Sequence, residues 1–380
     1  MILYPQIIAP YVRYLGTARA ASAAGSAIAQ LLAGEKRRAA AALTAIVDSG
    51  TGDAHALGAL GFIAYQNSQV ELALSLLEKA VEFDAGNAAN QTLLAACHLS
   101  LEHHPQAITA FRSALHLDPG LHAAHKLMWT AIDGIGQLDR AMAILKTVLG
   151  EHWERTRTPA STGPKVRIEE TTLCLVDCAN HLLVEHALAN CMRRCAFERV
   201  LWLTDRPVTL AGVDVEMIDP IRSAADYSRF LMKDLLRHID TEYVLTAQWD
   251  GYVVNPDAWS PEFLLFDYVG ARWDNPLNRE KTHHNVGNGG FALRSHALLE
   301  ALQDPTIKLL HPEDGMICRK YRSYLEDRHG LVFAPDDIAD RFSFEHIEQA
   351  ALPFGFHGVS NLAQFVAAPG WAALDFIPGV

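Results

Sequence analysis

The sequence is poor in cysteine, in long apolar runs and in positive charge, and each shortage excludes a class of protein. Six cysteines in 380 residues are too few for a disulfide scaffold and are typical of a reducing compartment, so a cytoplasmic location is predicted. No run of about 20 apolar residues occurs, so no membrane span is expected. The start, Met1–Pro5, lacks the basic residues of a secretory signal, and none is expected.

Positive charge is scarce because 32 Lys and Arg residues stand against 44 Asp and Glu residues, a net charge of −12 with histidine neutral. Binding to nucleic-acid phosphates needs a basic surface, so no nucleic-acid partner is expected. Half of the residues are apolar and a fifth are charged, as in ordinary globular proteins. The 380 residues are enough for two or three domains, each with its own hydrophobic core.

Four of the cysteines lie close together in the sequence, as Cys174, Cys178, Cys191 and Cys195. They form two pairs with three residues between the partners, which is not the C-x2-C spacing of structural zinc sites. Buried thiols are therefore favoured over a zinc site.

A period of 34 residues runs through the first part of the chain. Small residues recur at this spacing at four positions, Ala39, Ala73, Ala107 and Ala141. Four residues later, large apolar residues recur with the same spacing: Leu43, Leu77, Phe111 and Leu145. Positions four apart share one face of a helix, and small residues let two helices approach closely. The period therefore predicts a stack of helix pairs.

The segment 106–119, Gln-Ala-Ile-Thr-Ala-Phe-Arg-Ser-Ala-Leu-His-Leu-Asp-Pro, resembles the second helix of the tetratricopeptide repeat (TPR). The resemblance covers about residues 20–150, so a TPR-like helical solenoid is predicted for residues 1–150. It implies a concave face that binds a protein or peptide partner. The alternatives are a scaffold and a homodimer contact. Residues 151–166 lack apolar periodicity and are predicted to be a linker.

After this linker the pattern changes to short apolar runs that alternate with helical segments. Three such runs are Leu173–Val176, Val200–Leu203 and Tyr243–Thr246. The alternation predicts an α/β domain with a mainly parallel sheet. Asp177, Asp205 and Asp250 each come just after one of these runs. Ligands bind outside the carboxyl ends of such strands, so these acids are candidates for metal or nucleotide binding.

Three further segments carry a resemblance to glycosyltransferases of the GT-A fold: 244–252, 286–295 and 311–318. Their order also looks like that of an uncharacterised GT-A-like family, with a strand into Q-W-D-G, then V-G-N-G-G-F-x-L-R, then P-E-D. The match runs from about Val166 to Asn361. It implies a GT-A-like, Rossmann-type domain at residues 167–380 and a hexosyltransferase-like activity that uses a nucleotide-sugar.

In GT-A enzymes an acidic D-x-D motif holds a divalent metal against the diphosphate of the donor. Here the motif reads Gln248-Trp249-Asp250, with one carboxylate fewer. The resemblance implies Mn²⁺ or Mg²⁺ held by Asp250 and by His357, in the segment Phe356-His357-Gly358. A metal-independent mechanism remains open. So do a turn-capping role for Asp250 and an ordinary loop position for His357.

The pair Glu313-Asp314 follows Pro312 at the expected start of a helix. Inverting GT-A enzymes place their catalytic base at such a position, which implies Asp314 as the base and Glu313 as the second choice. The alternative is that both acids only stabilise the helix terminus. Inversion of configuration is the expectation, and retention stays open.

The residues implied in donor binding lie in all these segments: Asp177, Thr204, Asp205, Arg229, Lys233, Gln248, Trp249, Asp250, Asn288, Gly289 and Gly290. Arg229 and Lys233 are four apart, so one helix face would present both to phosphates, unless that face is only solvated. Gly289 and Gly290 allow close approach of backbone to a ligand, or simply form a turn before a strand.

Taken together, these features predict a glycosyltransferase whose repeat domain recruits the acceptor, a protein or peptide. The first rival is a non-enzymatic adaptor in which Q-W-D marks a decayed active site. A nucleotidyltransferase ranks last, because it needs more acidic ligands than residues 248–250 supply.

Overall fold

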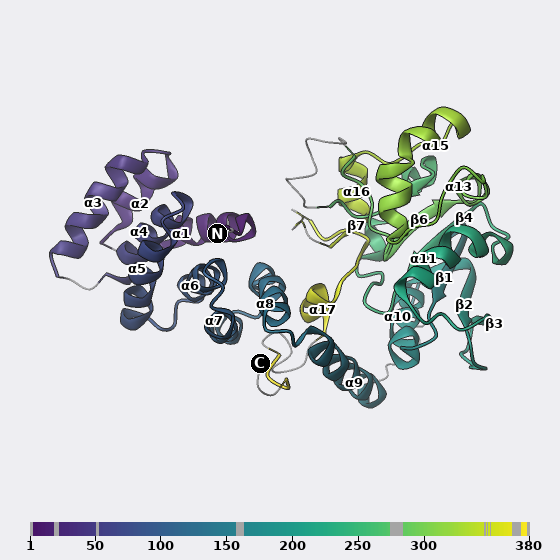
Figure 1. Cartoon of the computed structure of the whole chain (residues 1–380), viewed down its shortest axis with the longest axis horizontal. Coiled ribbons are helices and arrows are strands. Elements are labelled where there is room, and N and C mark those ends of the chain that lie inside the picture. The colour runs from purple at the N-terminus through teal and green to yellow at the C-terminus, as the bar shows by residue number, and fades with distance from the viewer. Residues whose placement is uncertain are drawn as a thin grey trace. The chain divides into compact units, whose positions relative to one another are not determined.

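The computed structural model describes residues 3–18, 23–50, 53–156, 163–273, 284–345, 347, 349, 351–366 and 374–377. The chain forms two compact units (Figure 1). The first comprises Met1–Thr147 and Ala363–Val380, and the second comprises Val148–Leu362. No helix within the described residues is both long and apolar enough to cross a bilayer.

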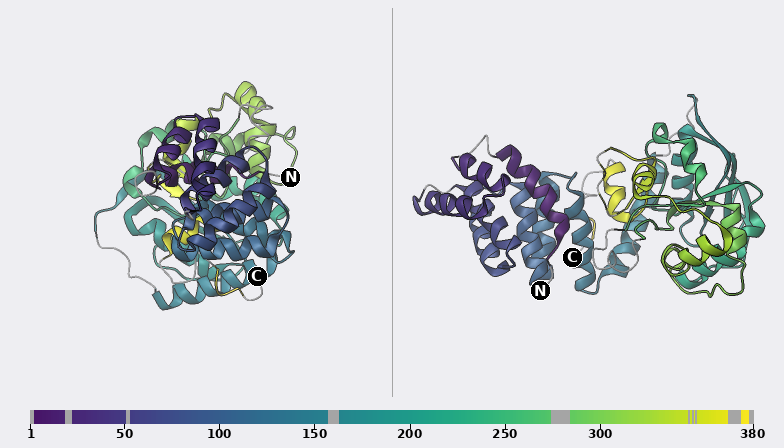
Figure 2. Two further views of the ribbon diagram at one scale, coloured as in Figure 1. Left: turned by 90° about the vertical axis from the view of Figure 1, so that its left-hand side faces the viewer. Right: turned by 90° about the horizontal axis from the view of Figure 1, so that it is seen from above.

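Helices alone build the described part of the first unit (Figures 1 and 2). They are η1 (Pro5–Ile7), α1 (Ile8–Ala18), α2 (Gly25–Leu32), α3 (Lys36–Asp48), α4 (Ala54–Gln66), α5 (Val70–Phe83), α6 (Ala88–Ser100), α7 (His104–Leu117), α8 (His122–Gly134) and α9 (Leu138–Thr156), whose end enters the second unit. Helices α3, α5, α7 and α9 begin 34 residues apart, as do α4, α6 and α8. The predicted stack of repeating helix pairs is confirmed.

The repeated residues explain the repeated geometry. Four alanines at the same place in α3, α5, α7 and α9 have no exposed surface: Ala39, Ala73, Ala107 and Ala141. Close helix approach leaves room only for such small side chains. One residue with positive φ follows α2, α4, α6 and α8 at the same spacing: Gly34, Ser68, Glu102 and Gly136. This left-handed residue ends each helix and turns the chain into the next one.

Helix α1 packs on the helices of the array. The Tyr11 ring stacks on Phe62 of α4 with 4.8 Å between centroids, and its hydroxyl donates to Asn90 of α6 at 2.7 Å. Beside α1 lies a cavity of about 570 Å³, which Arg13, Asp84 and Asp118 help to line. The chain's own N-terminal helix therefore covers part of the repeat surface.

Two domain boundaries differ from the sequence-based expectation. Residues 151–156 of the predicted linker are helical, since α9 runs on to Thr156 and the ring of Trp153 packs on His186 at 4.7 Å. Residues 157–162 of that linker lie outside the described residues. The chain's last described residues belong to the first unit, because Arg112 of α7 donates to the carbonyls of Leu374 and Ile377 at 2.9 and 3.1 Å.

The second unit is built on a six-stranded sheet of β1 (Val166–Val176), β2 (Cys195–Thr204), β3 (Asp214–Met217), β4 (Tyr243–Ala247), β5 (Tyr268–Val269) and β6 (Phe291–Ser295). The spatial order is β3-β2-β1-β4-β6-β5. The first four are parallel, and β6 is antiparallel to β4 and β5. A small parallel pair joins β7 (Ser343–Phe344) to β8 (Gly355–Phe356). The predicted fold class, helical repeats followed by an α/β domain with a mainly parallel sheet, is confirmed.

Helical segments of the second unit connect these strands. They are α10 (His181–Arg194), α11 (Ala224–Arg229), η2 (Phe230–Asp234), η3 (Leu235–His238), η4 (Pro256–Ala258), η5 (Pro261–Leu265), α13 (His296–Ala301), α14 (Glu313–Gly315), η6 (Met316–Lys320), α15 (Arg322–His329), α16 (Asp336–Phe342) and α17 (Val359–Phe365), whose end belongs to the first unit. The strand interiors are fully buried, for example at Leu173, Leu201, Leu245 and Leu293. Continuous apolar burial is what a sheet covered on both faces requires.

All six cysteines are free thiols. Cys174, Cys191 and Cys195 are buried, and burial raises the pKa of each to about 12. Within the described residues no three His, Cys, Asp or Glu side chains gather as a metal site. Cys174, Cys191 and Cys195 are therefore unreactive core thiols, whereas Cys178 is only half-buried.

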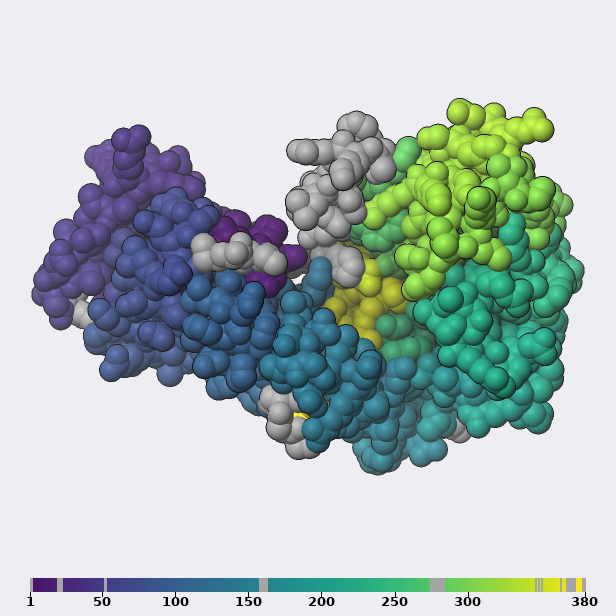
Figure 3. All heavy atoms as spheres, viewed as in Figure 1, coloured from purple at the N-terminus to yellow at the C-terminus, as the bar shows by residue number. Residues whose placement is uncertain are grey.

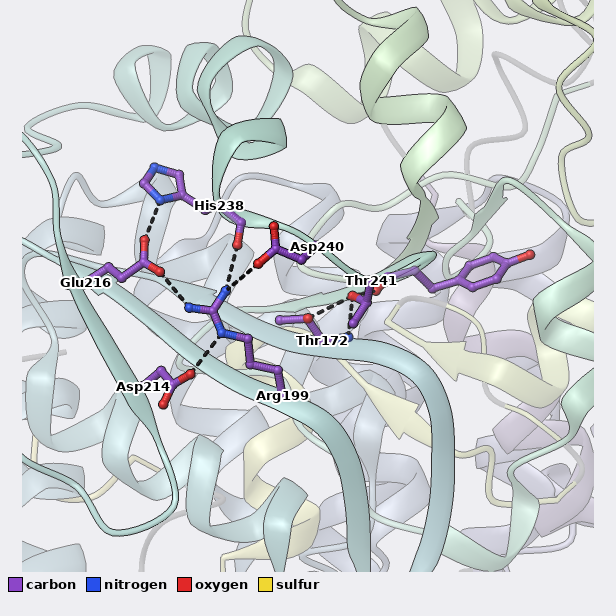
Figure 4. Close-up of polar contacts among 8 residues, drawn as sticks. Thr172, Arg199, Asp214, Glu216, His238, Asp240 and Thr241 are labelled. Carbon is purple, nitrogen blue, oxygen red and sulfur yellow. Dashed lines mark hydrogen bonds and ion pairs between the residues drawn. The ribbon is translucent and has the colours of Figure 1, made fainter.

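Arg199 holds the edge strand β3 to the sheet, toward the N-terminal ends of the strands (Figure 4). Its guanidinium donates to Asp214 at 2.9 Å, to Glu216 at 2.6 Å and to the His238 carbonyl at 2.9 Å. The His238 ring also pairs with Glu216 at 2.6 Å. A strand of four residues makes few ladder bonds, and these charged contacts add to its attachment.

Candidate functional site

Four neighbouring strands bring the predicted site segments to one edge of the sheet. Val176 lies opposite Leu203, Leu175 opposite Ala247, and Ala247 opposite Phe291. The residues that follow β1, β2 and β4, and those that precede β6, therefore share this edge. Three strand spacings of about 4.8 Å make a row about 14 Å long. Strand order reverses between β1 and β4, which is where such sheets bind ligands.

Gln248, Asp250 and Gly290 meet around His357. The Gln248 backbone N–H donates to the Gly290 carbonyl at 2.9 Å. Nε2 of His357 lies 3.2 Å from Oε1 of Gln248 and 3.4 Å from Oδ1 of Asp250. A Cβ atom on Gly290 would stand 2.1 Å from that nitrogen. Glycine is therefore required here so that the imidazole can reach the strand ends.

Glu345 lies on the other side of the same imidazole. Its Oε1 is 3.3 Å from Nδ1 of His357, and its Oε2 accepts a hydrogen bond from the Asn288 amide. Burial by itself lowers the pKa of His357, but the carboxylates of Asp250 and Glu345 outweigh it and raise this pKa well above its ordinary value. The two ring nitrogens of His357 thus lie 3.4 Å from Asp250 and 3.3 Å from Glu345.

Sequence reasoning missed Glu345, which lies outside all the motifs. The signal is tertiary: β7 and β8 are parallel, with Phe344 opposite Phe356. The residues that follow them, Glu345 and His357, are therefore neighbours. Figure 3 shows the yellow surface near the C-terminus beside the green surface of the preceding segments of the second unit.

The residues around His357 fit a divalent cation. Ligands about 2.1 Å from one ion, at angles near 90–110°, are about 3.0–3.4 Å apart. The spacings from Nε2 of His357 to Gln248 and Asp250 fall in this range. Oδ1 of Asp250 is buried and forms no hydrogen bond within the described residues. A metal here would take the Gln248 amide oxygen as a ligand, and Glu345 would orient the ring from behind.

Asp314 approaches the same glycine pair from the other side. Its Oδ2 accepts the backbone N–H of Gly289 at 3.1 Å, and its Oδ1 accepts that of Gly315 at 2.6 Å. Burial raises the pKa of the Asp314 carboxyl, and the neighbouring Glu313 carboxylate raises it further. A partly buried carboxylate with a raised pKa is suited to accept a proton.

The neighbouring acid, Glu313, has different partners from Asp314. It is 5% exposed, its Oε1 lies 3.3 Å from Nη2 of Arg294, and its Oε2 accepts a hydrogen bond from the Ser228 hydroxyl at 3.1 Å. Arg294 has no exposed surface. Both oxygens of Glu313 are thus engaged by side chains of the protein, whereas those of Asp314 accept backbone N–H groups.

The acidic residues after β1 and β2 lie at the same edge of the sheet, farther from β6. Asp177 accepts the backbone N–H groups of Ala179 and Asn180, both at 2.6 Å, and so shapes the turn into α10. The buried Thr204 hydroxyl lies 3.0 Å from Nε2 of His181. Asp205 follows Thr204 at the same edge and is half-buried. Trp249, also half-buried, stands between Gln248 and Asp250.

Arg229 and Lys233 bind different partners within the protein, and their role in phosphate binding stays a prediction. Residues Phe230–Asp234 form a π-helical turn, which places Arg229 beside the residue five positions on. Arg229 accordingly pairs with Asp234 at 3.1 Å. Lys233 donates to the carbonyls of Leu302 and Asp304, beyond α13.

Residues 213–357 match a family described only as a protein of unknown function, DUF5672. The match covers less than half of the chain and includes the segments around Gln248, Gly289, Asp314 and His357. No curated protein matches the chain.

Solved structures with helical repeats are similar to parts of the chain. A crystal structure of MamA protein is 22% identical, covers 36% of this chain and 74% of its own, and has a TM-score of 0.30. An O-GlcNAc transferase mutant from Thermobaculum terrenum is 17% identical, covers 61% of this chain and 45% of its own, and has a TM-score of 0.28. Likeness at this level does not bear on function.

Proposed function

We propose that the second unit is a glycosyltransferase that moves a sugar from a nucleotide-sugar to an acceptor hydroxyl. One observation carries the proposal: Gly289 and Gly290 bring together a carboxylate with a raised pKa, Asp314, and the group of Gln248, Asp250 and His357. Transfer of a sugar to a hydroxyl needs two parts, a proton acceptor and a cationic or metal-binding group. Here both parts lie beside one glycine turn.

In the proposed reaction Asp314 takes the proton of the acceptor hydroxyl. The acceptor oxygen forms a bond to the anomeric carbon of the donor sugar. The bond between that carbon and the phosphate oxygen breaks, and the electron pair leaves with the nucleoside diphosphate. A single displacement enters opposite the leaving group, so we expect inversion of configuration.

The leaving diphosphate gains negative charge that needs stabilisation. Mn²⁺ or Mg²⁺ on Gln248, Asp250 and His357 would supply positive charge to it. The edge of the sheet that runs from Gly290 to Asp177 and Asp205 has the length of a nucleoside. The carboxylates of Asp177 and Asp205 are candidates for ribose or base contacts.

The repeat unit is proposed to recruit the acceptor, a protein or peptide, from the cytoplasm. The stacked helices carry this proposal, since repeat arrays present extended surfaces for partners. The cavity beside α1, with Asp84, Asp118 and Tyr14 in its wall, is the part of this surface that α1 leaves open.

Thermal unfolding with a panel of nucleoside diphosphates and nucleotide-sugars tests the proposal, each with Mn²⁺, Mg²⁺ or EDTA. We expect at least one nucleotide to raise Tm, and mass spectrometry with host lysate to identify a glycosylated product. Asp250→Ala and Asp314→Asn should abolish transfer in folded protein, whereas Arg199→Lys should not. A panel without any response would favour the adaptor, and full activity of both variants would refute the site.

A further inference from the structure

Arg294 is a fully buried arginine on β6, four residues after Gly290. A guanidinium without exposed surface is costly unless an opposite charge accompanies it. Glu313 is that charge, with 3.3 Å between Nη2 and Oε1. Nε and Nη1 of Arg294 form no hydrogen bond within the described residues, so Glu313 is its principal polar partner there. Arg294 thus depends on one residue that directly precedes Asp314.

Ser228 of α11 holds Glu313 from the opposite side. The serine hydroxyl donates to Oε2 of Glu313 at 3.1 Å and accepts the Glu313 backbone N–H at 3.2 Å. Both the backbone and the side chain of Glu313 are therefore fixed. The position of the next residue, Asp314, follows from this anchoring.

Gly289 lies directly on the ion pair. A Cβ atom there would stand 2.2 Å from Oε1 of Glu313 and 2.9 Å from Nη2 of Arg294. The Gly289 backbone N–H, in turn, donates to Asp314 at 3.1 Å. The glycine turn, the ion pair and Asp314 thus form one closed set of contacts.

We propose that Arg294 is a positioning residue: through Glu313 it sets the first turn of α14, so that the Asp314 carboxylate stays on the Gly289 N–H. This inference rests on the proposed role of Asp314 as the base. It goes beyond that role because it assigns a function to Arg294, a buried side chain beside Gly289. Glu313 becomes the connector between Arg294 and Asp314.

The kinetic arm of the test uses the donor found in the nucleotide-sugar panel. Arg294→Met should lower kcat about 10-fold or more with little change in the donor KM, since small misplacements of a base act on the chemical step. Arg294→Lys keeps the charge and should restore part of kcat. Arg199→Lys, a matched change in an ion pair away from the site, should leave kcat unchanged. A donor KM that rises while kcat stays constant would overturn the proposal.

A second arm needs no substrate and tests the connection between Glu313 and Asp314. Glu313→Gln keeps the shape but removes the charge and replaces one acceptor oxygen by an NH2 group, so only one of the bonds from Ser228 and Arg294 can persist. The free energy of unfolding is measured against pH for four proteins. Asp314 is compared with Asp314→Asn, once in the protein with Glu313 and once in the Glu313→Gln variant. The difference between each pair of curves gives the pH range in which Asp314 titrates.

We expect this range to move to lower pH in Glu313→Gln, since a neighbouring negative charge is removed. An unchanged range would overturn the connector role of Glu313, even in an active enzyme. A shifted range in a protein that transfers no sugar from any donor would support the connection between Glu313 and Asp314 while refuting the proposed function. The two failures are thus distinguishable.

Discussion

Gly290 and Gly16 differ in what an added methyl group would meet. A Cβ atom on Gly290 would overlap the His357 ring at 2.1 Å, whereas one on Gly16 in α1 has nothing within 4 Å. At the residue scale, the site therefore depends on an absent side chain as much as on Asp250 and Asp314.

Gly290→Ala is predicted to displace His357 and to abolish the Tm increase caused by nucleotide with Mn²⁺ or Mg²⁺. The backbone at Gly290 can accept alanine, so the loss would come from the lost space and not from backbone strain. The control, Gly16→Ala, should leave nucleotide binding unchanged and stabilise α1 slightly, because alanine favours helix. Nucleotide binding that survives in Gly290→Ala would contradict the placement of His357.

Asp314→Asn is predicted to raise Tm at neutral pH while it abolishes transfer. The folded-state pKa of this carboxyl is raised, so folding favours the protonated form. The stability that protonated Asp314 contributes is present at low pH and is lost as pH rises through that raised pKa. Asparagine is neutral like the protonated form but has one acceptor oxygen for the N–H groups of Gly289 and Gly315, so the Tm gain should shrink and become a loss at low pH. Unfolding curves across pH check this, and a constant gain would argue against a raised pKa.

At the element scale, the edge strand β3 depends on charge and the repeat helices depend on size. Arg199 ties β3 to β2 through Asp214 and Glu216. The alanines of the array, by contrast, contribute by being small. These two elements should respond to different perturbations.

Arg199→Met is predicted to destabilise the protein by about 1 kcal/mol at pH 7, a modest value because Asp214 is exposed. Burial raises the pKa of Glu216, but hydrogen bonds from His238 and Arg199 outweigh it and lower this pKa. The stability from Glu216 is therefore present above its ordinary pKa and is lost as pH falls through the lowered one. Denaturant unfolding should show the gap between wild type and variant closing in acid.

Ala107→Leu is predicted to cost about 1–3 kcal/mol, because extra volume between closely packed helices forces them apart. Ala107 has no exposed surface in α7. The matched control is Ala143→Leu on the exposed face of α9, which should change the unfolding free energy little. Equal effects of both substitutions in chemical denaturation would show that Ala107 does not mark a close helix contact.

At the scale of the whole molecule, the two units have separate cores and the proposed site lies within the second one. Hydrogen exchange with the nucleotide that raises Tm should therefore slow in β4, β6 and α14 and stay unchanged in α3 to α7. A ligand stabilises the structure that it contacts, and protection spreads only through cooperative units. Protection that extended through the repeat helices would show that the units act as one.

The sequence by itself determined the features that depend on local, periodic patterns. The 34-residue spacing of Ala39 and its equivalents specifies the helix pairs, since helix packing repeats whenever its residues repeat. Short apolar runs specify parallel strands, whose carboxyl ends must share an edge. For that reason Gln248, Asp250 and Gly290 could be placed near one another in advance, and the structure confirms that they meet.

Only the tertiary structure decided the contacts between segments without a common period. Glu345 reaches His357 through the β7–β8 pairing, and Arg294 reaches Glu313 through the path of the chain between them. The π-helical turn redirected Arg229, since the α-helical spacing assumed for it does not hold there. Such contacts follow from how loops return to the sheet and from which buried charges find partners, and no local pattern records either.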